Sequence, residues 1–299
     1  MSKNVCLVCG SSALLNITTG YSRYWPRLFK KVAACQDCGH IQLNPLYAAK
    51  EYEEINTKFF SKAYLANGRS NVVNNGKKLK KLEEFLDARL SSGLRVLDVG
   101  AGEAWALPYF MKKCGNYSAI EEVPKLFTSI RDKGGRVIAT SLNSDLNGFN
   151  GAFDVIIFRH TIEHLLDPKK ALGKLRDLLS ENGVIFLALP NSSQPGAKKG
   201  FRTSYLRPVH ISYFCEGNCR RLVISCGFKI LQDKVDGEIQ FLLGKASSDL
   251  EVVRFQNYYD EQLQVFKAAQ KKAFFKDIRF FIKDILKAPF GDKRKYLRL

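Results

Sequence analysis

The sequence contains no long hydrophobic run, since nothing in its 299 residues approaches the roughly 18 apolar residues of a membrane-spanning helix. Its first residues, MSKNVCLVCG, also lack the apolar stretch of a secretion signal. Acidic residues are scarce: 29 Asp and Glu stand against 47 Lys and Arg and leave a net charge of +18. We therefore expect neither a signal peptide nor a membrane span. The positive charge predicts an anionic partner, which could be nucleic acid, an acidic membrane face, or a phosphorylated or acidic substrate.

The composition is otherwise that of a globular protein. Hydrophobic residues make up 45% and charged residues 25%, which argues against disorder. The length fits one large domain or a core with appendages. We divide the chain into four segments: residues 1–45 with paired cysteines, 46–90 as a polar helical linker or lid, 91–245 as the core, and 246–299 as an aromatic, basic helical segment.

Short apolar strands alternate with amphipathic helices through the core segment. We expect strands at Leu94–Val99, Tyr117–Ile120, Arg136–Ala139, Phe153–Phe158 and Gly183–Leu189, and helices at Ala104–Cys114, Pro124–Lys133 and Pro168–Leu179. This alternation predicts an α/β fold with a parallel sheet covered on both faces. The last two strands, Phe228–Val235 and Glu238–Lys245, are joined by Asp236-Gly237, which predicts a terminal antiparallel hairpin.

A glycine-rich loop follows the first strand of the core. Gly100 and Gly102 permit a sharp turn and close approach of a ligand, and Ala104 is the third small residue. Glu121 ends the second strand about 20 residues later, where a carboxylate can accept hydrogen bonds from ribose hydroxyls. Glu122 is interpreted as its solvated neighbour. The alternative is a tight turn without a ligand.

Several motifs occur in the order of a known family. They are VLDVGAGEA, the acidic end of the second strand, FDVIIFRHTIEHLLDP and LLSENGVIFLALPN. Together they resemble a class I S-adenosylmethionine-dependent methyltransferase over residues 91–245, which implies a Rossmann-like seven-stranded sheet with the terminal hairpin. Glu163–Pro168, Arg207–Phe214 and Gly227-Phe228 resemble the branch that methylates sugars, surface polysaccharides and quinone precursors.

The resemblance implies a cofactor site. Asp98, Gly100 and Gly102 would border the methionine part of S-adenosylmethionine, and Glu121 would hold its ribose. Asp98 also lies in an apolar run, where a buried carboxylate needs a partner; the alternative is a loop cap. Adenine would lie near Ser141 and Leu142, with Asn143 or Asp145 as a polar contact, and His160 at the end of the fourth strand is a further candidate.

Methyl transfer to a hydroxyl needs alignment and a base, and His suits that role near neutral pH. We expect His210 or His164 to be the base, with Glu163 beside them. Alternatively, His164 orders its loop by hydrogen bonding. The four-residue spacing of His160 and His164 also permits a metal site, although the His-Glu-x-x-His order of zinc proteases is absent.

The pairs Cys6/Cys9 and Cys35/Cys38 have the spacing and following glycines of a zinc knuckle. Four thiolates close the shell of a tetrahedral Zn²⁺, which predicts a structural site; a redox pair or a vacant thiol site is the alternative. Some sugar methyltransferases resemble this arrangement. Tyr21, Tyr24 and Trp25 would line a substrate lid or pack the module, and the remaining four cysteines are expected in the core: Cys114, Cys215, Cys219 and Cys226. Reduced cysteines without an export signal predict a cytoplasmic protein.

The C-terminal segment has apolar residues at helical spacing and much of the positive charge. Residues 271–299 contain ten basic and three acidic residues. We expect a helix that packs on the core or on a second subunit. Alternatively, it contacts an anionic membrane, because Phe274, Phe275, Phe280 and Phe281 alternate with Lys271, Lys272, Lys276, Arg279 and Lys283.

These observations predict a cytoplasmic S-adenosylmethionine-dependent methyltransferase of a sugar or glycan precursor, nucleotide- or lipid-linked, that methylates oxygen. One alternative acceptor is a quinone precursor or small phenol. Another is a zinc-ribbon protein that binds nucleic acid. Nucleobase methylation is disfavoured, because Arg159–Ile162 stands where an Asn/Asp-Pro-Pro-Tyr/Phe motif would be, and no Pro-Cys nucleophile follows the fourth strand.

Overall fold

The computed structural model describes residues 4–22, 28–66, 72–196, 200–207, 209–246 and 255–287. Tyr24, Trp25 and the 288–299 part of the basic tail lie outside the described residues. Among the residues that are described, no helix combines the length and hydrophobicity that a bilayer crossing requires.

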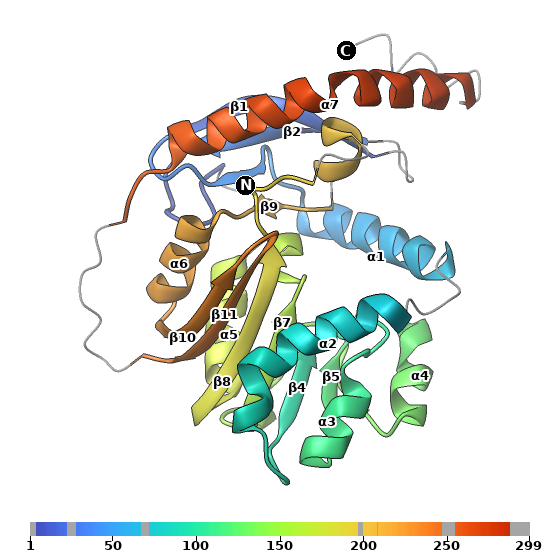
Figure 1. Cartoon of the computed structure of the whole chain (residues 1–299), viewed down its shortest axis with the longest axis vertical. Helices are drawn as coiled ribbons and strands as arrows, with labels where there is room; N and C mark the ends of the chain where they lie inside the picture. The colour runs from blue at the N-terminus through green and yellow to red at the C-terminus, as the bar shows by residue number, and fades with distance from the viewer. Residues whose placement is uncertain are drawn as a thin grey trace.

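A seven-stranded sheet forms the lower part of the molecule in Figure 1, in the order β10-β11-β8-β7-β4-β5-β6. Its strands are β4 (Val96–Val99), β5 (Ser118–Ile120), β6 (Arg136–Ala139), β7 (Phe153–Arg159), β8 (Leu179–Pro190), β10 (Phe228–Val235) and β11 (Glu238–Lys245). The five neighbouring strands β8, β7, β4, β5 and β6 are parallel to one another, whereas β11 runs antiparallel to both β8 and β10. The predicted sheet and terminal hairpin are therefore confirmed.

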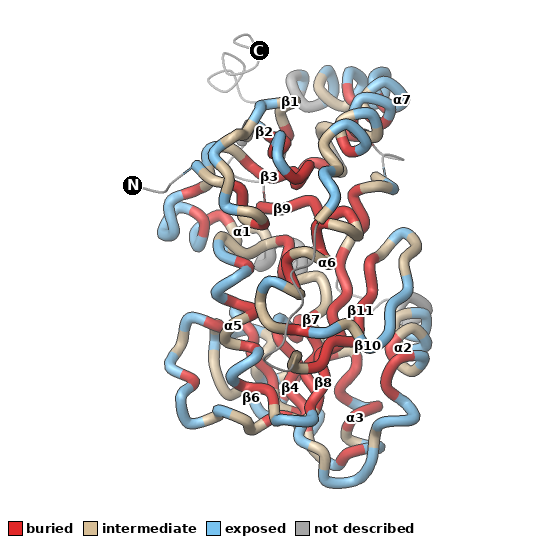
Figure 2. The backbone as a smooth tube through the Cα atoms, turned by 90° about the vertical axis from the view of Figure 1, so that its left-hand side faces the viewer, coloured by how far each residue is buried: buried red, intermediate tan, exposed pale blue. Residues whose placement is uncertain are grey.

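Helices cover both faces of this sheet, because consecutive residues of the central strands β4, β7 and β8 are buried and point to opposite faces. They are α2 (Val72–Leu86), α3 (Leu107–Cys114), α4 (Phe127–Asp132), α5 (Pro168–Leu178) and α6 (Glu216–Ser225). One core packs α2 and α3 against the sheet through Leu82, Phe110 and Phe186. The other packs α5 and α6 through Leu172, Leu222 and Phe158. Figure 2 shows the buried strands between these partly exposed helices.

Several predicted boundaries differ from the structure by one to four residues, and two of the larger differences have a clear structural cause. The helix expected from Ala104 begins only at Leu107, because Ala104 has a φ of 47°, outside the helical region. The strand expected from Gly183 already begins at Leu179, directly after α5. The Cα of Leu179 pairs with that of Phe153, so strand pairing extends this element.

A second sheet carries the paired cysteines. It has the order β1-β2-β3-β9, with β1 (Leu14–Ser22), β2 (Leu28–Cys35), β3 (Ile41–Leu43) and β9 (Ser212–Tyr213). Because β9 comes from the core segment, residues 1–45 do not close this sheet alone. The helices α1 (Ala49–Ala66) and α7 (Tyr259–Lys287) lie at this end of the molecule, with α7 across β1 and β2 (Figure 1).

Candidate functional site

The glycine-rich loop lies where the sheet order changes direction, beside the ends of β4 and β5, the usual ligand crevice of such folds. Gly100 has a φ of 74°, and its N–H donates to the Ile120 carbonyl at 2.9 Å. A Cβ on Gly100 would lie 2.5 Å from Oγ1 of Thr161. The position therefore needs glycine both for its backbone conformation and for the close approach of the segment after β7.

The Glu121 carboxylate stabilises this loop by hydrogen bonds to backbone N–H groups. One carboxylate oxygen accepts the N–H of Gly102 at 2.7 Å, and the other accepts the N–H of Val123 at 2.8 Å. Glu121 is only 4% exposed, and burial raises its pKa despite these hydrogen bonds. Its remaining lone pairs can accept ribose hydroxyls. Its exposed neighbour Glu122 instead accepts a hydrogen bond from Asn56 of α1, at 3.0 Å.

Asp98 lies in β4 immediately before the loop. It is 4% exposed, and its carboxylate accepts a short hydrogen bond from the Tyr117 hydroxyl. Burial raises the pKa of Asp98 to about 7, although the Tyr117 hydrogen bond opposes this. A cationic ligand group nearby would favour the ionised form, as electrostatic coupling requires.

The loop after β6 borders Glu121, since the Glu121 N–H donates to the Ala139 carbonyl at 3.2 Å. Leu142 is buried in the core, whereas the Ser141 hydroxyl accepts the N–H of Asn143 at 3.1 Å. Asn143 and Asp145 are exposed. The residues expected near adenine thus follow the strand next to Glu121, and only Leu142 among them is apolar and buried.

The segment after β7 brings the predicted catalytic residues together. Glu163 is 2% exposed, and neither of its carboxylate oxygens has a hydrogen-bond partner among the described residues. Burial alone would raise its pKa, but His160, His164 and His210 outweigh burial and lower it to about 2. Glu163 is therefore an anion enclosed by three imidazoles.

His164 and His210 lie edge to face with their ring centres 4.8 Å apart. The Nδ1–H of His164 donates to the Val209 carbonyl at 2.9 Å, which sets its tautomer. Burial lowers the pKa of both histidines, so both are neutral at pH 7. Nearby Pro208 lies outside the described residues.

His160 has a different environment. Its Nε2 donates to Glu238 at 2.7 Å, and its Nδ1 lies 3.4 Å from Glu163. Burial would lower the pKa of His160, but these two carboxylates outweigh burial and raise it. Among the described residues, the group of possible metal ligands at this place consists of Glu163, His164 and His210, whose ligand atoms lie within 4.8 Å of one another. His160, which was expected to pair with His164, does not belong to this group. That trio can hold a proton or a divalent cation.

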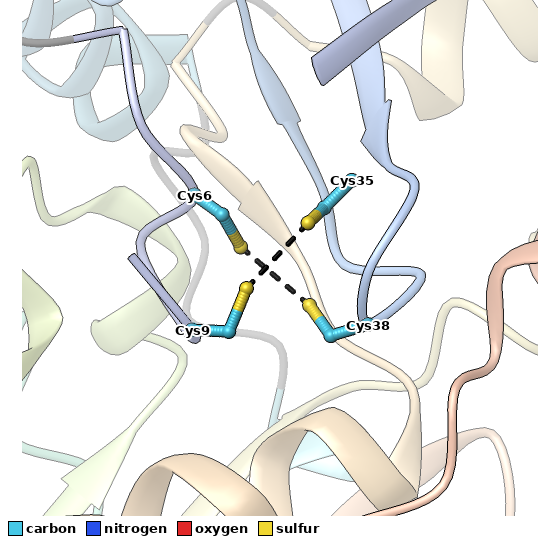
Figure 3. Close-up of side chains that lie close together, drawn as sticks. All are labelled: Cys6, Cys9, Cys35 and Cys38. Atoms are coloured by element: carbon cyan, nitrogen blue, oxygen red, sulfur yellow. Dashed lines mark hydrogen bonds between the residues drawn. The ribbon is translucent and has the colours of Figure 1, made fainter. Parts of the chain in front are cut away.

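The four paired cysteines converge, as Figure 3 shows. The sulfurs of Cys6 and Cys38 are 3.6 Å apart, those of Cys9 and Cys35 are 3.5 Å apart, and all four lie within 4.8 Å of one another. Zn–S bonds of about 2.3 Å in a tetrahedron place sulfurs about 3.8 Å apart, so the cluster can hold this ion. His40 stays outside it, with Nε2 3.2 Å from the Ser212 hydroxyl.

The comparisons with known proteins agree with this arrangement. Residues 74–233, more than half of the 299-residue chain, match the family described as a methyltransferase domain. The chain belongs to this methyltransferase family. No curated protein sequence matches it.

Three solved methyltransferase structures are similar to this chain. The 1,6-didemethyltoxoflavin-N1-methyltransferase of Burkholderia thailandensis, solved with S-adenosylhomocysteine, is 20% identical with a TM-score of 0.55, covering 73% of this chain and 96% of that one. An S-adenosylmethionine-dependent methyltransferase of Mesorhizobium loti is 14% identical with a TM-score of 0.45, over 55% and 95% of the two chains. One of Aquifex aeolicus is 19% identical with a TM-score of 0.44, over 55% and 87%. The first of these structures, with the TM-score of 0.55, shows that the chain has the expected Rossmann-like methyltransferase fold.

In this methyltransferase, sequence reasoning missed Glu238, the centre of a charged cluster. Arg159 and His160 from the end of β7 and Lys81 from α2 all pair with it. Glu238 opens β11 after the Asp-Gly turn and belongs to no recognised motif. Its partners come from distant parts of the chain, so only the folded sheet brings them together.

Proposed function

We propose that the protein transfers a methyl group from S-adenosylmethionine to a hydroxyl of a sugar or glycan precursor for surface polysaccharide. The observation that carries this proposal is the contact between the cofactor loop and the histidine segment. The Thr161 side chain adjoins Gly100, and its hydroxyl donates to the Val99 carbonyl at 3.1 Å. A cofactor on the loop would therefore face the residues that follow Thr161.

The residues around the glycine loop fit the cofactor. Asp98 would face its cationic methionine end, Glu121 would accept the ribose hydroxyls, and Ser141 and Leu142 would border adenine, with His160 beside the loop. S-adenosylmethionine supplies an activated methyl group on a sulfonium. The protein then has only to align the acceptor and remove its proton.

We assign proton removal to His210 or His164. Both are neutral at pH 7 because burial lowers their pKa, so either can accept the proton of the acceptor hydroxyl as its oxygen bonds to the methyl carbon. The imidazolium that forms would be stabilised by Glu163, whose lowered pKa keeps it anionic. This pairing of neutral bases with a buried anion supports the role of general base.

The four-cysteine cluster would hold a structural Zn²⁺. Its cysteines pack into the same core as Phe214 and Cys219 of the methyltransferase segment. That packing favours a lid or brace on the catalytic core over the alternative of a separate nucleic-acid module. A quinone precursor or small phenol is the alternative acceptor.

The test is methyl transfer from radiolabelled S-adenosylmethionine to a panel of nucleotide sugars, lipid-linked glycans, quinone precursors and phenols. We expect turnover on a sugar acceptor. The single variants His164→Gln and His210→Gln identify the base by a loss of at least about 100-fold in kcat, with unchanged binding of S-adenosylhomocysteine. Turnover only on phenols would show that the acceptor is a phenol and not a sugar. An undiminished kcat in both variants would contradict the role of the histidines as general bases.

We also place the enzyme in the cytoplasm, with peripheral contact to an anionic membrane through residues 271–299. Within this range the structure describes α7 up to Lys287.

A further inference from the structure

The inward face of α7 is fixed to the rest of the protein. Phe266 and Ala273 are buried on it, and the Tyr21 ring packs against Phe280 and Phe281 with ring centres 6.0 and 5.3 Å apart. Asp277 is 4% exposed and points into the protein. Phe280 and Phe281, expected on a membrane face, therefore belong to the packed side.

The outward face is apolar over several turns. Its large hydrophobic side chains are Phe274 (53% exposed), Phe275 (82%), Ile278 (38%), Ile282 (54%) and Leu286 (73%). Residues 274, 278, 282 and 286 follow one another at i+4 spacing, which aligns them along one side of the helix. Among the described residues, only Leu15 and Leu231 are other large hydrophobics with comparable exposure. Such a concentrated patch marks an interaction surface.

Positive charge adjoins this apolar face. The basic residues Lys271, Lys272, Lys276, Arg279 and Lys283 are all exposed. Between them the one acidic residue, Asp277, is buried on the opposite side. Two copies meeting through this face would bring equal positive charges together, which is unfavourable. The charge therefore favours an occupant that is both negative and apolar.

We propose that the outward face of α7, residues 271–286, docks on an anionic phospholipid bilayer. The aromatic and aliphatic side chains would enter the boundary between headgroups and acyl chains, and the lysines and Arg279 would pair with lipid phosphates. This combination is typical of helices that lie in a membrane surface. Figure 1 shows α7 along the end of the molecule that carries the cysteine sheet, away from the seven-stranded sheet.

The same helix supports the catalytic segment. The Asp277 carboxylate accepts the N–H groups of Phe201, Arg202 and Thr203 at 3.1–3.2 Å and the Thr203 hydroxyl at 2.6 Å. These residues begin the stretch that leads to His210. Docking would thus hold the acceptor side of the enzyme at a defined orientation to the membrane, although membrane binding itself does not depend on the proposed reaction.

The test is flotation of the full chain with vesicles of phosphatidylcholine alone or mixed equally with phosphatidylglycerol. We expect flotation with the mixed vesicles, weakened by high salt because screening shortens the range of charge attraction. Phe275→Glu/Ile282→Glu should reduce the bound fraction at least tenfold, whereas Leu231→Glu, at an exposed site on β10, should not.

A second pair of variants separates charge from apolar contact. Lys276→Glu/Arg279→Glu should reduce binding to the mixed vesicles, whereas Lys77→Glu/Lys80→Glu on α2 should reduce it much less. Unchanged melting temperatures and binding of S-adenosylhomocysteine show that the variants fold and leave the cofactor site intact. Failure of the wild type to float would overturn the proposal, as would flotation of the α7 variants at the wild-type level. So would a dimer that Phe275→Glu/Ile282→Glu dissociates, because a second copy would then cover the face.

Discussion

The substitution Glu163→Gln removes one buried negative charge and keeps the shape of the side chain. The pKa of Glu163 is about 2 instead of 4.5, because three nearby imidazoles outweigh the effect of burial. At about 1.4 kcal/mol per pKa unit, the ionised carboxylate stabilises the native state by at most about 3 kcal/mol. At pH 7 this stabilisation comes from His160, because His164 and His210 are neutral there. Because the folded-state pKa is lowered, this stabilisation is present above pH 4.5 and is lost as the pH falls through about 2. Gln mimics the protonated form, so the variant should lose up to about 3 kcal/mol at pH 7 and about half of that at pH 3.

Urea denaturation of the wild type and Glu163→Gln across this pH range measures the difference in unfolding free energy. Glu181→Gln is the matched control, because the Glu181 side chain is 86% exposed, and it should change stability by no more than about 0.5 kcal/mol. A loss below about 1 kcal/mol in Glu163→Gln at pH 7, or a difference that grows as the pH falls, would refute the electrostatic account of this site.

Asp277→Ala leaves three backbone N–H groups without their acceptor and should lower the free energy of unfolding by about 3 kcal/mol in denaturant titration; a loss under about 1 kcal/mol would show that these bonds are dispensable. Gly100→Ala places a Cβ against the Thr161 hydroxyl and should weaken S-adenosylhomocysteine binding at least tenfold by calorimetry, whereas unchanged affinity would mean that the loop does not contact the ligand. Glu238→Gln should lower the pKa of His160 in an NMR titration. The stability that the raised pKa of His160 gives the folded protein is present below pH 6.5 and is lost as the pH rises through the folded-state pKa. A difference in unfolding free energy between the wild type and Glu238→Gln that does not change with pH would contradict this account. A chelator should remove one equivalent of Zn²⁺ per chain and lower the melting temperature. A metal-free protein with an unchanged melting temperature would exclude a structural ion.

The sheet and the glycine-rich loop were predictable because their signals are local. Apolar strands separated by helical stretches set the parallel order, and Asp236-Gly237 indicates the hairpin by turn chemistry. Gly100 and Glu121 lie at the ends of adjacent strands, so their proximity follows from the fold class.

The remaining features depend on contacts between distant segments. The strand β9 joins the cysteine sheet through only two residues, Ser212 and Tyr213, which carry no strand pattern of their own. Glu238 meets Lys81 and His160 only after the hairpin has joined the sheet. Asp277 is one charged residue among many in α7, and its burial depends on the segment that it contacts rather than on its neighbours in sequence.

The central claim is that the loop around Gly100, braced by Glu121, binds S-adenosylmethionine, and calorimetric titration with S-adenosylhomocysteine tests it without knowledge of the acceptor. We predict one ligand per wild-type chain. Loss of the two ribose hydrogen bonds to a carboxylate, worth about 1.5 kcal/mol or more each, should weaken binding by Glu121→Ala at least about 100-fold. Glu122→Ala, the matched control on the exposed neighbour, should bind like the wild type. Absence of binding to the wild type, or equal affinity in Glu121→Ala, would contradict the account.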